Sequence, residues 1–514
     1  MLARLLSYGL NGIEGYPITV EVDISNGLPA FEIVGLPDAA VKESKDRVRS
    51  AIRNSGLEFP MQRITVNLAP AHTRKEGTLY DLPIAVGLLA ATRQIPKDAI
   101  ENLVFLGELS LDGEIRPVNG ILPVAIDAKT KDLIHLVIPA PNAPEAAYIE
   151  GLHILPASRL DQLVKHLRGD DTMPSQDFIP WESISHNVSF STDLSQIRGQ
   201  QSAKRAIEIA AAGGHNILFI GPPGSGKTML ARSIPSILPD LTFDEALEIT
   251  KIHSVAGGQR QMPVGIATDR PFRAPHHSIS LVALTGGGAT AKPGEVSLAH
   301  YGVLYLDELP EFERGALEAM RQPLEDGEIT VARINANTTY PARFMLVASM
   351  NPCPCGNYGN PEKECRCTPL QIQRYLGRIS GPLLDRIDIQ IEMGAVSFQQ
   401  LSGEGDGDKS AVVKARVNES RQRQVDRLKH DGVYCNAQMD SKLIGKHCKT
   451  DEPGRELLKK AFTTLNLSAR GYGRVLKVAR TIADIDGCEN ITAAHVAEAI
   501  QYRSLDRKYW GFSI

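Results

Sequence analysis

One short stretch constrains the fold of this chain more than any other. The sequence Gly221-Pro-Pro-Gly-Ser-Gly-Lys-Thr228 follows an apolar run, Asn216 to Ile220, and precedes a helical pattern from Met229 to Ile237. This is G-x-x-x-x-G-K-[ST] between a buried strand and a helix, the context that a phosphate-binding loop requires. Its glycines permit a tight turn whose N–H groups face phosphate oxygens, and the helix N-terminus adds a positive dipole. We therefore expect an α/β fold with a nucleotide at the edge of its sheet.

The residues of this loop have specific expected roles. Lys227 is expected to reach the β- and γ-phosphates, and the Thr228 hydroxyl to hold Mg²⁺. The residues expected to contact the nucleotide are Gly221, Pro222, Pro223, Gly224, Ser225, Gly226, Lys227, Thr228 and Met229. The alternative is a glycine-rich turn that binds nothing, which the surrounding strand and helix argue against.

Two later apolar runs end in the polar residues that nucleotide hydrolysis needs. The run that begins at Gly302 ends in Asp307 and Glu308, at the carboxyl end of a strand, where open α/β sheets bind ligands. We expect Asp307 to hold Mg²⁺, mostly through water, and Glu308 to polarise the attacking water. The alternative is a strand that ends in surface acids. The next buried strand ends at Asn351, which suits a residue that orients water against the γ-phosphate.

Shorter patterns on either side resemble parts of AAA+ ATPases. The pair Gly199-Gln200, about twenty residues before the loop, resembles the segment that packs on adenine in these proteins. Arg470, which opens a long helical pattern, resembles their sensor-2 arginine, with Arg474 as the second candidate. For the first pattern an ordinary loop and helix remains the alternative.

An arginine finger is expected near the end of the ATPase core. Arg386 lies at the end of a short helix before the next strand, which suits a residue that reaches the γ-phosphate of a neighbouring chain. Arg374 and Arg378 are the further candidates, and an intrachain salt bridge is the alternative for Arg386. A finger that acts in trans would require the ATPase to form a ring.

Several segments are candidates for contact with DNA. Residues 328–344 read as a hairpin with Arg333 and Asn335 near its tip, similar to the pore hairpin of helicase-type AAA+ rings, although a plain solvated turn fits as well. The pair His276-His277 lies in a long glycine-rich stretch, for which we favour loop structure or DNA contact over a metal site. Lys409 to Lys429 predicts a basic helix that either tracks phosphates or presents a solvated face.

Four of the seven cysteines cluster in the sequence. Cys353, Cys355, Cys365 and Cys367 fall within fifteen residues. Four thiols so placed can form a Cys₄ zinc site, but their C-x-C spacing is less common than C-x₂-C. Zn²⁺ and reduced structural thiols both remain open, and an odd total argues against a disulfide framework.

Length and composition indicate a soluble protein of two to four domains. The chain has 514 residues and a net charge of −4, so any DNA contact must come from a local patch. We expect a first α/β domain over residues 1–167, a linker over 168–190, an ATPase core over 191–402 and a helical lid over 403–514. No apolar run is long enough to cross a membrane and no signal peptide is evident, so we expect no membrane partner and a cytoplasmic location.

The first domain resembles the proteolytic domain of Lon. The resemblance is carried by Val66-Asn-Leu-Ala-Pro-Ala71, Lys75-Glu-Gly77 and Gly107-Glu-Leu-Ser-Leu-Asp-Gly113. The Ser–Lys dyad of Lon would fall at Leu79 and near Val124, and alkyl side chains cannot act as nucleophile or base. The resemblance therefore implies a Lon-like α/β fold, with the topology of ribosomal protein S5 domain 2, but without protease activity.

Taken together, the order of motifs resembles the YifB/ComM family of magnesium-chelatase-like AAA+ ATPases. The resemblance covers essentially the whole chain and includes Phe272-Arg-Ala-Pro-His-His277, Pro293-Gly-Glu-Val-Ser-Leu-Ala-His300 and Asn351-Pro-Cys-Pro-Cys-Gly356. It implies a parallel-sheet core with a helical lid, use of ATP and Mg²⁺, and a homo-hexameric ring. It also implies a DNA helicase that drives branch migration on single-stranded and branched DNA during natural transformation, alongside recombination proteins. The alternative is a magnesium-chelatase-type motor subunit that acts on a protein or tetrapyrrole partner.

Overall fold

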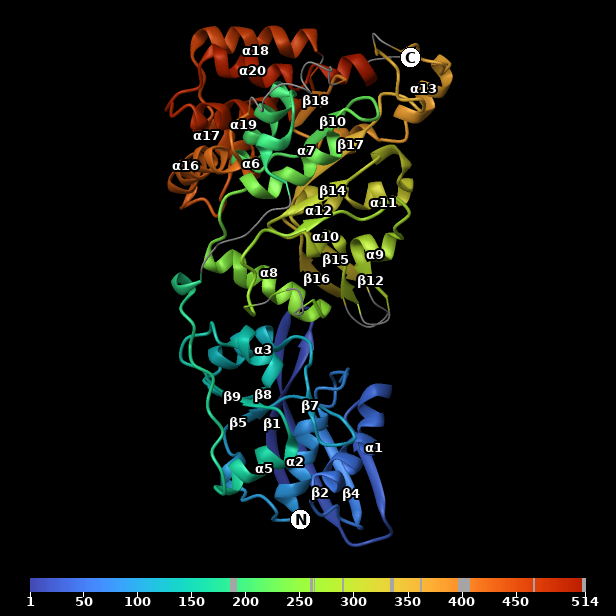
Figure 1. Ribbon diagram of the computed structural model, residues 1–514, viewed down its shortest axis with the longest axis vertical. Helices are drawn as coiled ribbons and strands as arrows, with labels where there is room; N and C mark the ends of the chain where they lie inside the picture. Colours follow the sequence, from blue (N-terminus) through green and yellow to red (C-terminus); the bar gives the residue numbers. More distant parts are fainter. Residues whose placement is uncertain are drawn as a thin grey trace. The chain divides into compact units, whose positions relative to one another are not determined.

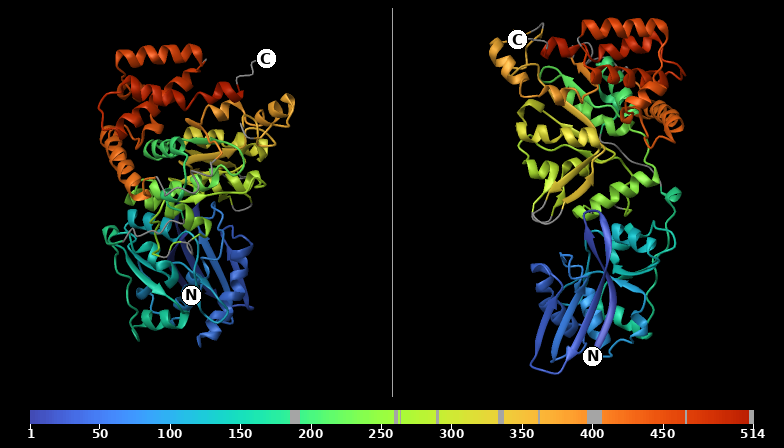
Figure 2. Two further views of the ribbon diagram at one scale, coloured as in Figure 1. Left: turned by 45° about the horizontal axis from the view of Figure 1, so that its top comes forward. Right: turned by 180° about the vertical axis from the view of Figure 1, so that it is seen from behind.

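The computed structural model of the chain has an α/β architecture throughout (Figures 1 and 2). It describes residues 1–184, 192–258, 262, 264–288, 291–332, 337–360, 363–395, 407–465 and 467–510. Within these ranges no helix is both long and apolar enough to cross a membrane.

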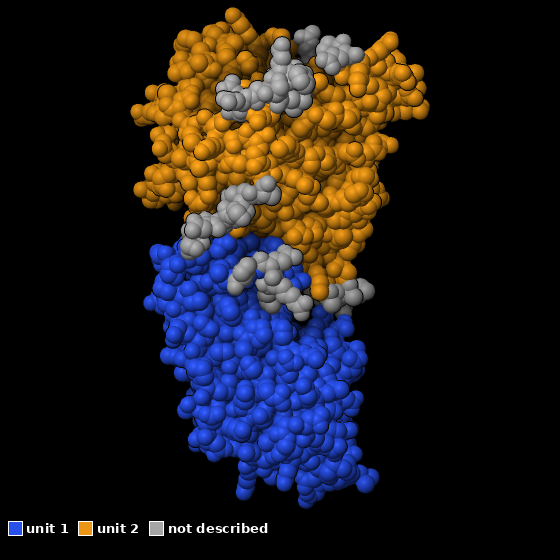
Figure 3. Space-filling view, viewed as in Figure 1, with its two compact units in different colours: residues 1–186, 243–268 blue, residues 187–242, 269–514 orange. Residues whose placement is uncertain are grey.

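Two compact units make up the chain (Figure 3). Unit 1 contains Met1–His186 and Phe243–Thr268, and unit 2 contains Asn187–Thr242 and Asp269–Ile514. The expected ATPase core of residues 191–402 includes the segment 243–268, whereas the structure groups this segment with unit 1. The rest of the expected ATPase core lies together with the expected helical lid in unit 2.

Unit 1 is built on a mixed seven-stranded sheet in the order β3-β4-β2-β1-β5-β8-β9. The strands are β1 (Leu2–Asn11), β2 (Glu14–Ser25), β3 (Ala30–Val34), β4 (Arg63–Ala69), β5 (Leu103–Phe105), β8 (His135–Pro139) and β9 (His153–Ala157). β1 pairs antiparallel with β2, and β5, β8 and β9 run parallel. In β2 the alternate residues Ile18, Val20 and Val22 are fully buried, because side chains two apart share one face of a strand.

The helices of unit 1 cover this sheet, and a short hairpin follows β5. The helices are α1 (Ala39–Asn54), α2 (Asp81–Ala91), α3 (Ile121–Thr130), α4 (Ala143–Ala146) and α5 (Leu160–Arg168), and the hairpin pairs β6 (Glu108–Leu109) with β7 (Ile115–Arg116). Asp38 caps α1, since its carboxylate accepts a hydrogen bond from Val41 N at 2.8 Å. Every residue of α2 is buried, and apart from Asp81 its sequence is apolar throughout.

Helix α8 (Phe243–Ala256) belongs to unit 1 because buried polar contacts hold it there. Gly120 N donates to the carbonyl oxygen and to the Oγ of Ser254, both at 3.1 Å. The Ser254 hydroxyl donates to Glu145 Oε2 at 2.7 Å, and Asn142 Nδ2 donates to Glu145 Oε1 at 2.7 Å. A buried carboxylate needs such partners, and α8 supplies one of them. The sequence pattern alone does not indicate that α8 packs in unit 1.

The two positions aligned with the Lon dyad lie in the apolar core of unit 1. Leu79 is 8% exposed and Val124 is 2% exposed. Lys75 and Ser110, which lie in the segments that carry the Lon resemblance, are buried at 0% and 5% exposure. Lys75 Nζ donates to the carbonyl oxygens of Thr73, at 2.7 Å, and of Pro70, so it supports its own loop.

Unit 2 contains a five-stranded sheet in the order β11-β14-β17-β10-β18, and all of its pairs are parallel. The strands are β10 (Ile217–Ile220), β11 (Phe272–Arg273), β14 (Val303–Leu306), β17 (Met345–Met350) and β18 (Ile389–Glu392). All residues of β10, β14 and β17 are buried. These strands read as continuous apolar runs because a parallel sheet is covered on both faces.

Helices flank this sheet, and those of residues 410–501 gather together in both ribbon views (Figures 1 and 2). Along the ATPase core they are α6 (Gln201–Gly213), α7 (Lys227–Ser233), α9 (Leu281–Thr285), α10 (Glu295–Leu298), α11 (Arg314–Ala319), α12 (Arg321–Asp326), α13 (Pro369–Leu376) and α14 (Gly381–Leu384). The C-terminal helices are α16 (Ser410–Leu428), α17 (Ser441–His447), α18 (Glu452–Thr464), α19 (Ala469–Ile485) and α20 (Ala493–Gln501). Two small antiparallel pairs complete the unit: β12 (Gly286–Gly287) with β13 (Lys292–Pro293), and β15 (Glu328–Ala332) with β16 (Asn337–Pro341).

Two arginines of the basic helix α16 form ion pairs with other helices of the unit. Arg416 Nε lies 2.6 Å from Glu208 of α6, and Arg427 Nη2 lies 2.6 Å from Asp484 of α19. These two side chains tie α16 to its neighbours, and contact of the helix with phosphates remains a proposal. Arg333 and Asn335, the expected DNA contacts of the β15–β16 hairpin, lie outside the described residues.

We predict that the Arg47–Asp81 pair stabilises unit 1. Arg47 donates to Asp81 Oδ2 at 2.6 Å and to Oδ1 at 3.0 Å, and Asp81 is fully buried. Arg47→Met should lower the free energy of unfolding by about 3 kcal/mol, because it leaves a buried carboxylate without its counter-ion. Chemical unfolding followed by Trp181 fluorescence in a Trp510→Phe background measures this, because these two are the only tryptophans.

The deficit should depend on pH. Burial raises the pKa of Asp81 to about 6, against the lowering effect of the Arg47 hydrogen bonds. A carboxyl whose folded pKa is raised favours folding while it is protonated, and this contribution is lost as pH rises through the folded pKa. The cost of Arg47→Met should therefore be smaller at pH 5 than at pH 8. The exposed Lys42→Met on the same helix is the control, and equal costs for both variants would contradict the assignment.

Candidate nucleotide site

The candidate site lies where three parallel strands of unit 2 end. β17 lies between β10 and β14, with Ile220 opposite Met350 and Leu306 opposite Ala348. The residues that follow the three strands are Gly221, Asp307 and Asn351. The loops after these strands therefore meet at one edge, as expected of ligand sites in open α/β sheets.

The Lys227 side chain contacts two of the loops that meet at this edge. Its Nζ donates to the carbonyl oxygens of Gly221 and Pro222, at 2.7 and 2.9 Å. It also donates to Asn351 Oδ1 at 3.2 Å, so the two expected phosphate-side residues are in direct contact. Burial lowers the pKa of Lys227, although Asp307 and Glu308 act in the opposite direction. An anionic phosphate would favour the charged ammonium here.

The expected magnesium ligands are also in contact. Thr228 Oγ1 donates to Asp307 Oδ2 at 3.1 Å, so a hydroxyl and a carboxylate meet at the loop–strand junction. The buried Ser349 hydroxyl donates to the other oxygen, Asp307 Oδ1, and Tyr305 OH lies 3.3 Å from Thr228 Oγ1 and 3.2 Å from Ser349 Oγ. Oxygen donors of this kind suit Mg²⁺.

The loop itself fits a phosphate. Gly224 and Gly226 have φ values of +80° and +89°, the left-handed region that glycine adopts without strain. Ser225 Oγ is buried and has no hydrogen-bond partner among the described residues. Buried hydroxyls normally have a partner, so this donor is consistent with a phosphate oxygen as its partner. Met229, next to the loop, is 42% exposed.

The expected adenine segment lies beside this loop. Gln200 Nε2 donates to the carbonyl oxygen of Gly394 at 2.8 Å and to that of Ser225 at 3.3 Å. Gly199 and Gln200 both have left-handed φ values, of +61° and +56°. The structure thus brings these residues next to the phosphate-binding loop, and their contact with adenine remains a proposal.

Three family models match most of the chain. The model for magnesium chelatase, subunit ChlI, matches residues 193–401, that for subunit ChlI of Mg-chelatase matches 20–142, and that for the ChlI C-terminal part matches 407–503. Among individual proteins, Competence protein ComM of Haemophilus influenzae is 46% identical over 98% of both chains. YifB of Escherichia coli, described as uncharacterized, is 47% identical over 96% of both. The chain belongs to the YifB/ComM family of magnesium-chelatase-like AAA+ proteins. Membership implies use of ATP and Mg²⁺.

More distant relatives carry the chelatase name itself. The magnesium-chelatase subunit ChlI of Nicotiana tabacum is 23% identical over 55% of this chain and 66% of its own length. The YifB/ComM proteins thus share much more of this chain than the chelatase subunits do.

Glu308, the expected base, stands at the solvent side of the site. It has a left-handed φ of +55°, and its side chain is 56% exposed. His277 Nδ1 lies 3.8 Å from Glu308 Oε2, and the ring of His277 lies against that of His276 with a centroid distance of 4.1 Å. The sequence interpretation assigned His277 to loop structure or DNA contact and did not connect it with Glu308.

The expected arginine finger is engaged within its own chain. Arg386 is 7% exposed, and its Nε and Nη1 donate to the carbonyl oxygens of Arg321 and Pro382 at 3.1 and 2.7 Å. Its Nη2 forms an ion pair with Glu325, the intrachain alternative that the sequence left open. Arg470 pairs with the other carboxylate oxygen of Glu325 at 3.2 Å. One carboxylate therefore holds both the expected finger and the expected sensor-2 residue.

These arginines lie at the edge of the sheet opposite the phosphate-binding loop. Arg474 Nη1 donates to Asp388 Oδ1 at 2.6 Å, and His215 Nδ1 lies 3.1 Å from Asp388 Oδ2. Asp388 N donates to Asn216 O, immediately before β10, whereas the loop follows the other end of that strand. Burial opposes the ionised form of Asp388, but Arg474 and His215 outweigh it and lower its pKa. Arg474 is thus engaged with Asp388 in its own chain, and its contact with the nucleotide remains a proposal.

Ser349 and Tyr305 are the site residues that sequence reasoning missed. Both lie inside apolar strands, at positions where the motif pattern assigns only burial. A signal was present, since a serine in the otherwise apolar run from Met345 to Met350 requires a hydrogen-bond partner when buried. Its partner, Asp307, is 42 residues away in sequence and is not evident from spacing.

We predict that Ser349 sets the orientation of Asp307. Ser349→Ala should weaken the apparent affinity for Mg²⁺ in the presence of ATP by about tenfold, because groups that orient a metal ligand typically contribute 10- to 100-fold. Nucleotide binding titrated against Mg²⁺ measures this. Ser297→Ala is the matched control, since Ser297 Oγ is equally buried and has no partner among the described residues. An unchanged Mg²⁺ dependence in Ser349→Ala would contradict the role.

Proposed function

We propose that this protein is an Mg²⁺-dependent ATP hydrolase that assembles as a homo-hexameric ring and moves DNA. Its task would be helicase-driven branch migration, which integrates single-stranded DNA during natural transformation and recombination. The observation that carries the ATPase part is the contact of Lys227 with Asn351 and of Thr228 with Asp307 at one sheet edge. The DNA part is supported by a relative named for competence, 46% identical over 98% of the chain.

We assign a role to each site residue from this geometry. Lys227 and the loop amides hold the phosphates, and Thr228 and Asp307 hold Mg²⁺, which neutralises charge on the phosphate oxygens. Glu308 orients and polarises water, and Asn351 fixes that water against the γ-phosphate. The exposure of Glu308 leaves room for water at its carboxylate.

The arginines support a ring rather than an isolated subunit. Arg386, Arg470 and Arg474 are joined to Glu325 and Asp388 at the edge opposite the chain's own loop. We propose that an arginine at this edge reaches a nucleotide that is bound by a neighbour. We propose that Arg386 and Arg470 leave Glu325, which is half-exposed, for the γ-phosphate of the adjacent protomer. Closed rings repeat such a head-to-tail contact at every interface.

Hydrolysis should stop in two distinguishable ways. Lys227→Ala should lose nucleotide binding, because the phosphates lose their only buried cation in the loop. Glu308→Gln should retain ATP binding while turnover falls by about 100-fold or more, as for loss of a general base. Filter binding of labelled ATP and phosphate release measure the two properties. Glu313→Gln, at an exposed acid close to Glu308 in sequence, is the control. Wild-type turnover in Glu308→Gln would overturn its role.

Mixing variants tests whether Arg386 acts in trans. Arg386→Ala and Glu308→Gln should each be inactive alone, but mixed rings combine an intact Glu308 with an intact neighbouring Arg386 at about a quarter of interfaces. Phosphate release should therefore reappear on mixing. Arg374→Ala, the alternative finger, mixed in the same way is the comparison. Absence of rescue would assign Arg386 to the intrachain pair alone.

The response of the ATP hydrolysis rate to DNA distinguishes a DNA motor from a chelatase-type motor subunit. The rate of ATP hydrolysis should rise with single-stranded and forked DNA, and electron microscopy should show six-membered particles. The models for magnesium chelatase also match this chain, so a chelatase-type motor subunit is the second candidate. Turnover that ignores DNA but responds to a protein or tetrapyrrole partner would favour that candidate.

A further inference from the structure

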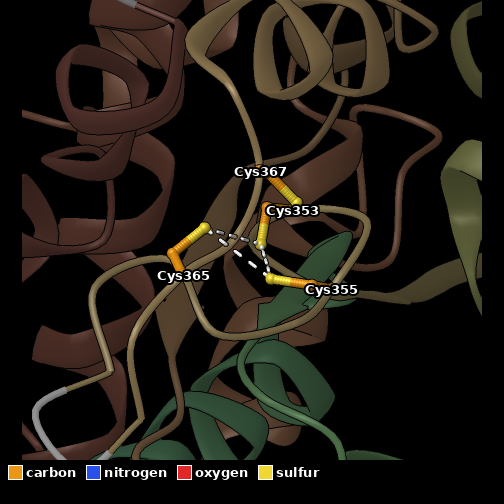
Figure 4. A group of neighbouring side chains, drawn as sticks. All are labelled: Cys353, Cys355, Cys365 and Cys367. Atoms are coloured by element: carbon orange, nitrogen blue, oxygen red, sulfur yellow. Dashed lines mark hydrogen bonds between the residues drawn. The ribbon is translucent and has the colours of Figure 1, made fainter.

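Four cysteine side chains converge in unit 2 directly after the strand that ends at Asn351. Figure 4 shows the sulfur atoms of Cys353, Cys355, Cys365 and Cys367 pointing toward a common centre. The Sγ atoms of Cys353 and Cys355 are 3.4 Å apart, and each lies 3.7 Å from that of Cys365. All four ligand atoms lie within 4.8 Å of one another, and all four thiols are free.

These distances match a tetrahedral metal site rather than disulfides. Four sulfurs at 2.3 Å from one zinc ion lie about 3.8 Å from each other, and the observed separations are close to that value. A disulfide would bring two sulfurs to about 2.05 Å. Four free thiols in van der Waals contact gain little from one another, since each is a weak donor and acceptor. Their convergence therefore indicates a shared ligand.

The backbone around the cluster supports thiolate ligands. Tyr358 N donates to Cys353 Sγ at 3.3 Å, and the amides of Asn357 and Arg366 face the sulfur of Cys355. Such donors stabilise negative sulfur and orient it toward a metal. The turn between the two halves depends on Gly356, which has a φ of +78°.

We propose that these four thiolates bind one structural Zn²⁺, which fixes the described segments 352–360 and 363–367 against the nucleotide site. Four protein ligands leave no open position, so the ion is structural and not catalytic. The cluster is close to the site: a methyl group on Gly356 would lie 2.5 Å from Pro223 Cδ of the phosphate-binding loop. Asn351, two residues before Cys353, holds Lys227. The zinc site would thus set the position of both.

Metal content tests the zinc site independently of any activity. The full chain, purified without chelators or a histidine tag, should contain one zinc ion per chain by elemental analysis. X-ray absorption at the zinc edge should show four sulfur neighbours at about 2.3 Å. A full set of titratable thiols without metal would overturn the proposal, as would iron or a coloured cluster in place of zinc.

Variants assign the ion to this cluster. Cys365→Ser combined with Cys367→Ser should lose the zinc, whereas Cys488→Ser, at an exposed cysteine outside the cluster, should retain it. If the double variant does not fold, the sulfur coordination measured on the wild-type chain still decides between zinc and free thiols. Zinc retained in a folded double variant would overturn the assignment.

The coupling to the nucleotide site rests on the proposed function. Removal of zinc by a mercurial, with reversal by thiol and added Zn²⁺, should reduce ATP turnover at least tenfold and restore it on reloading. The chain with Cys488→Ser should respond identically. Zinc bound and released with no effect on turnover would overturn the coupling but leave the metal site standing. If the wild-type chain shows no ATP turnover at all, the proposed function fails instead, and the metal analysis is unaffected.

Discussion

The convergence of three strand ends at one edge of a parallel sheet is the constraint on which the rest of unit 2 depends. Because β17 lies between β10 and β14, the residue after β17 is the one placed to touch the loop after β10. The contact of Lys227 with Asn351 is the direct result. The same order puts Asp307 in direct contact with Thr228, and Ser349 of β17 donates to the other carboxylate oxygen of Asp307. Sheet order thus turns three separate sequence motifs into one polar cluster.

At the opposite edge of the sheet, arginine side chains are paired with carboxylates of the same chain. Residues that begin β18 lie beside the residue before β10, so Arg386 and Asp388 are far from the chain's own phosphate-binding loop. Glu325 neutralises Arg386 and Arg470 together, so neither cation is left unpaired in the single chain. In the proposed ring, a neighbour's phosphate would have to compete with Glu325 for these arginines. Since Glu325 is half-exposed, its ion pairs are partly screened by water and are weaker than buried ones.

Local patterns predicted much of this fold, and long-range contacts explain what they missed. The apolar runs of β10, β14 and β17 and the loop at Gly221 are local, and the structure has each where the sequence placed it. The assignment of α8 to unit 1 depends on Ser254 meeting Glu145, more than a hundred residues apart. The internal use of Arg416 likewise depends on Glu208. Charge and periodicity indicate whether a helix face is polar or apolar, but not which residues pack against that face.

The cysteine cluster addresses a physical difficulty of the loop after β17. That loop must hold Asn351 in place, yet among its described residues between 352 and 367 only Pro352, Cys353 and Gly356 are buried. A segment with so little apolar burial cannot offset the entropy of its own ordering. Ligands at both of its ends allow a single ion to cross-link them, and the binding free energy of the metal then becomes ordering free energy. A metal bound at this loop, next to the candidate nucleotide site, would contribute more ordering free energy than the packing of the loop does.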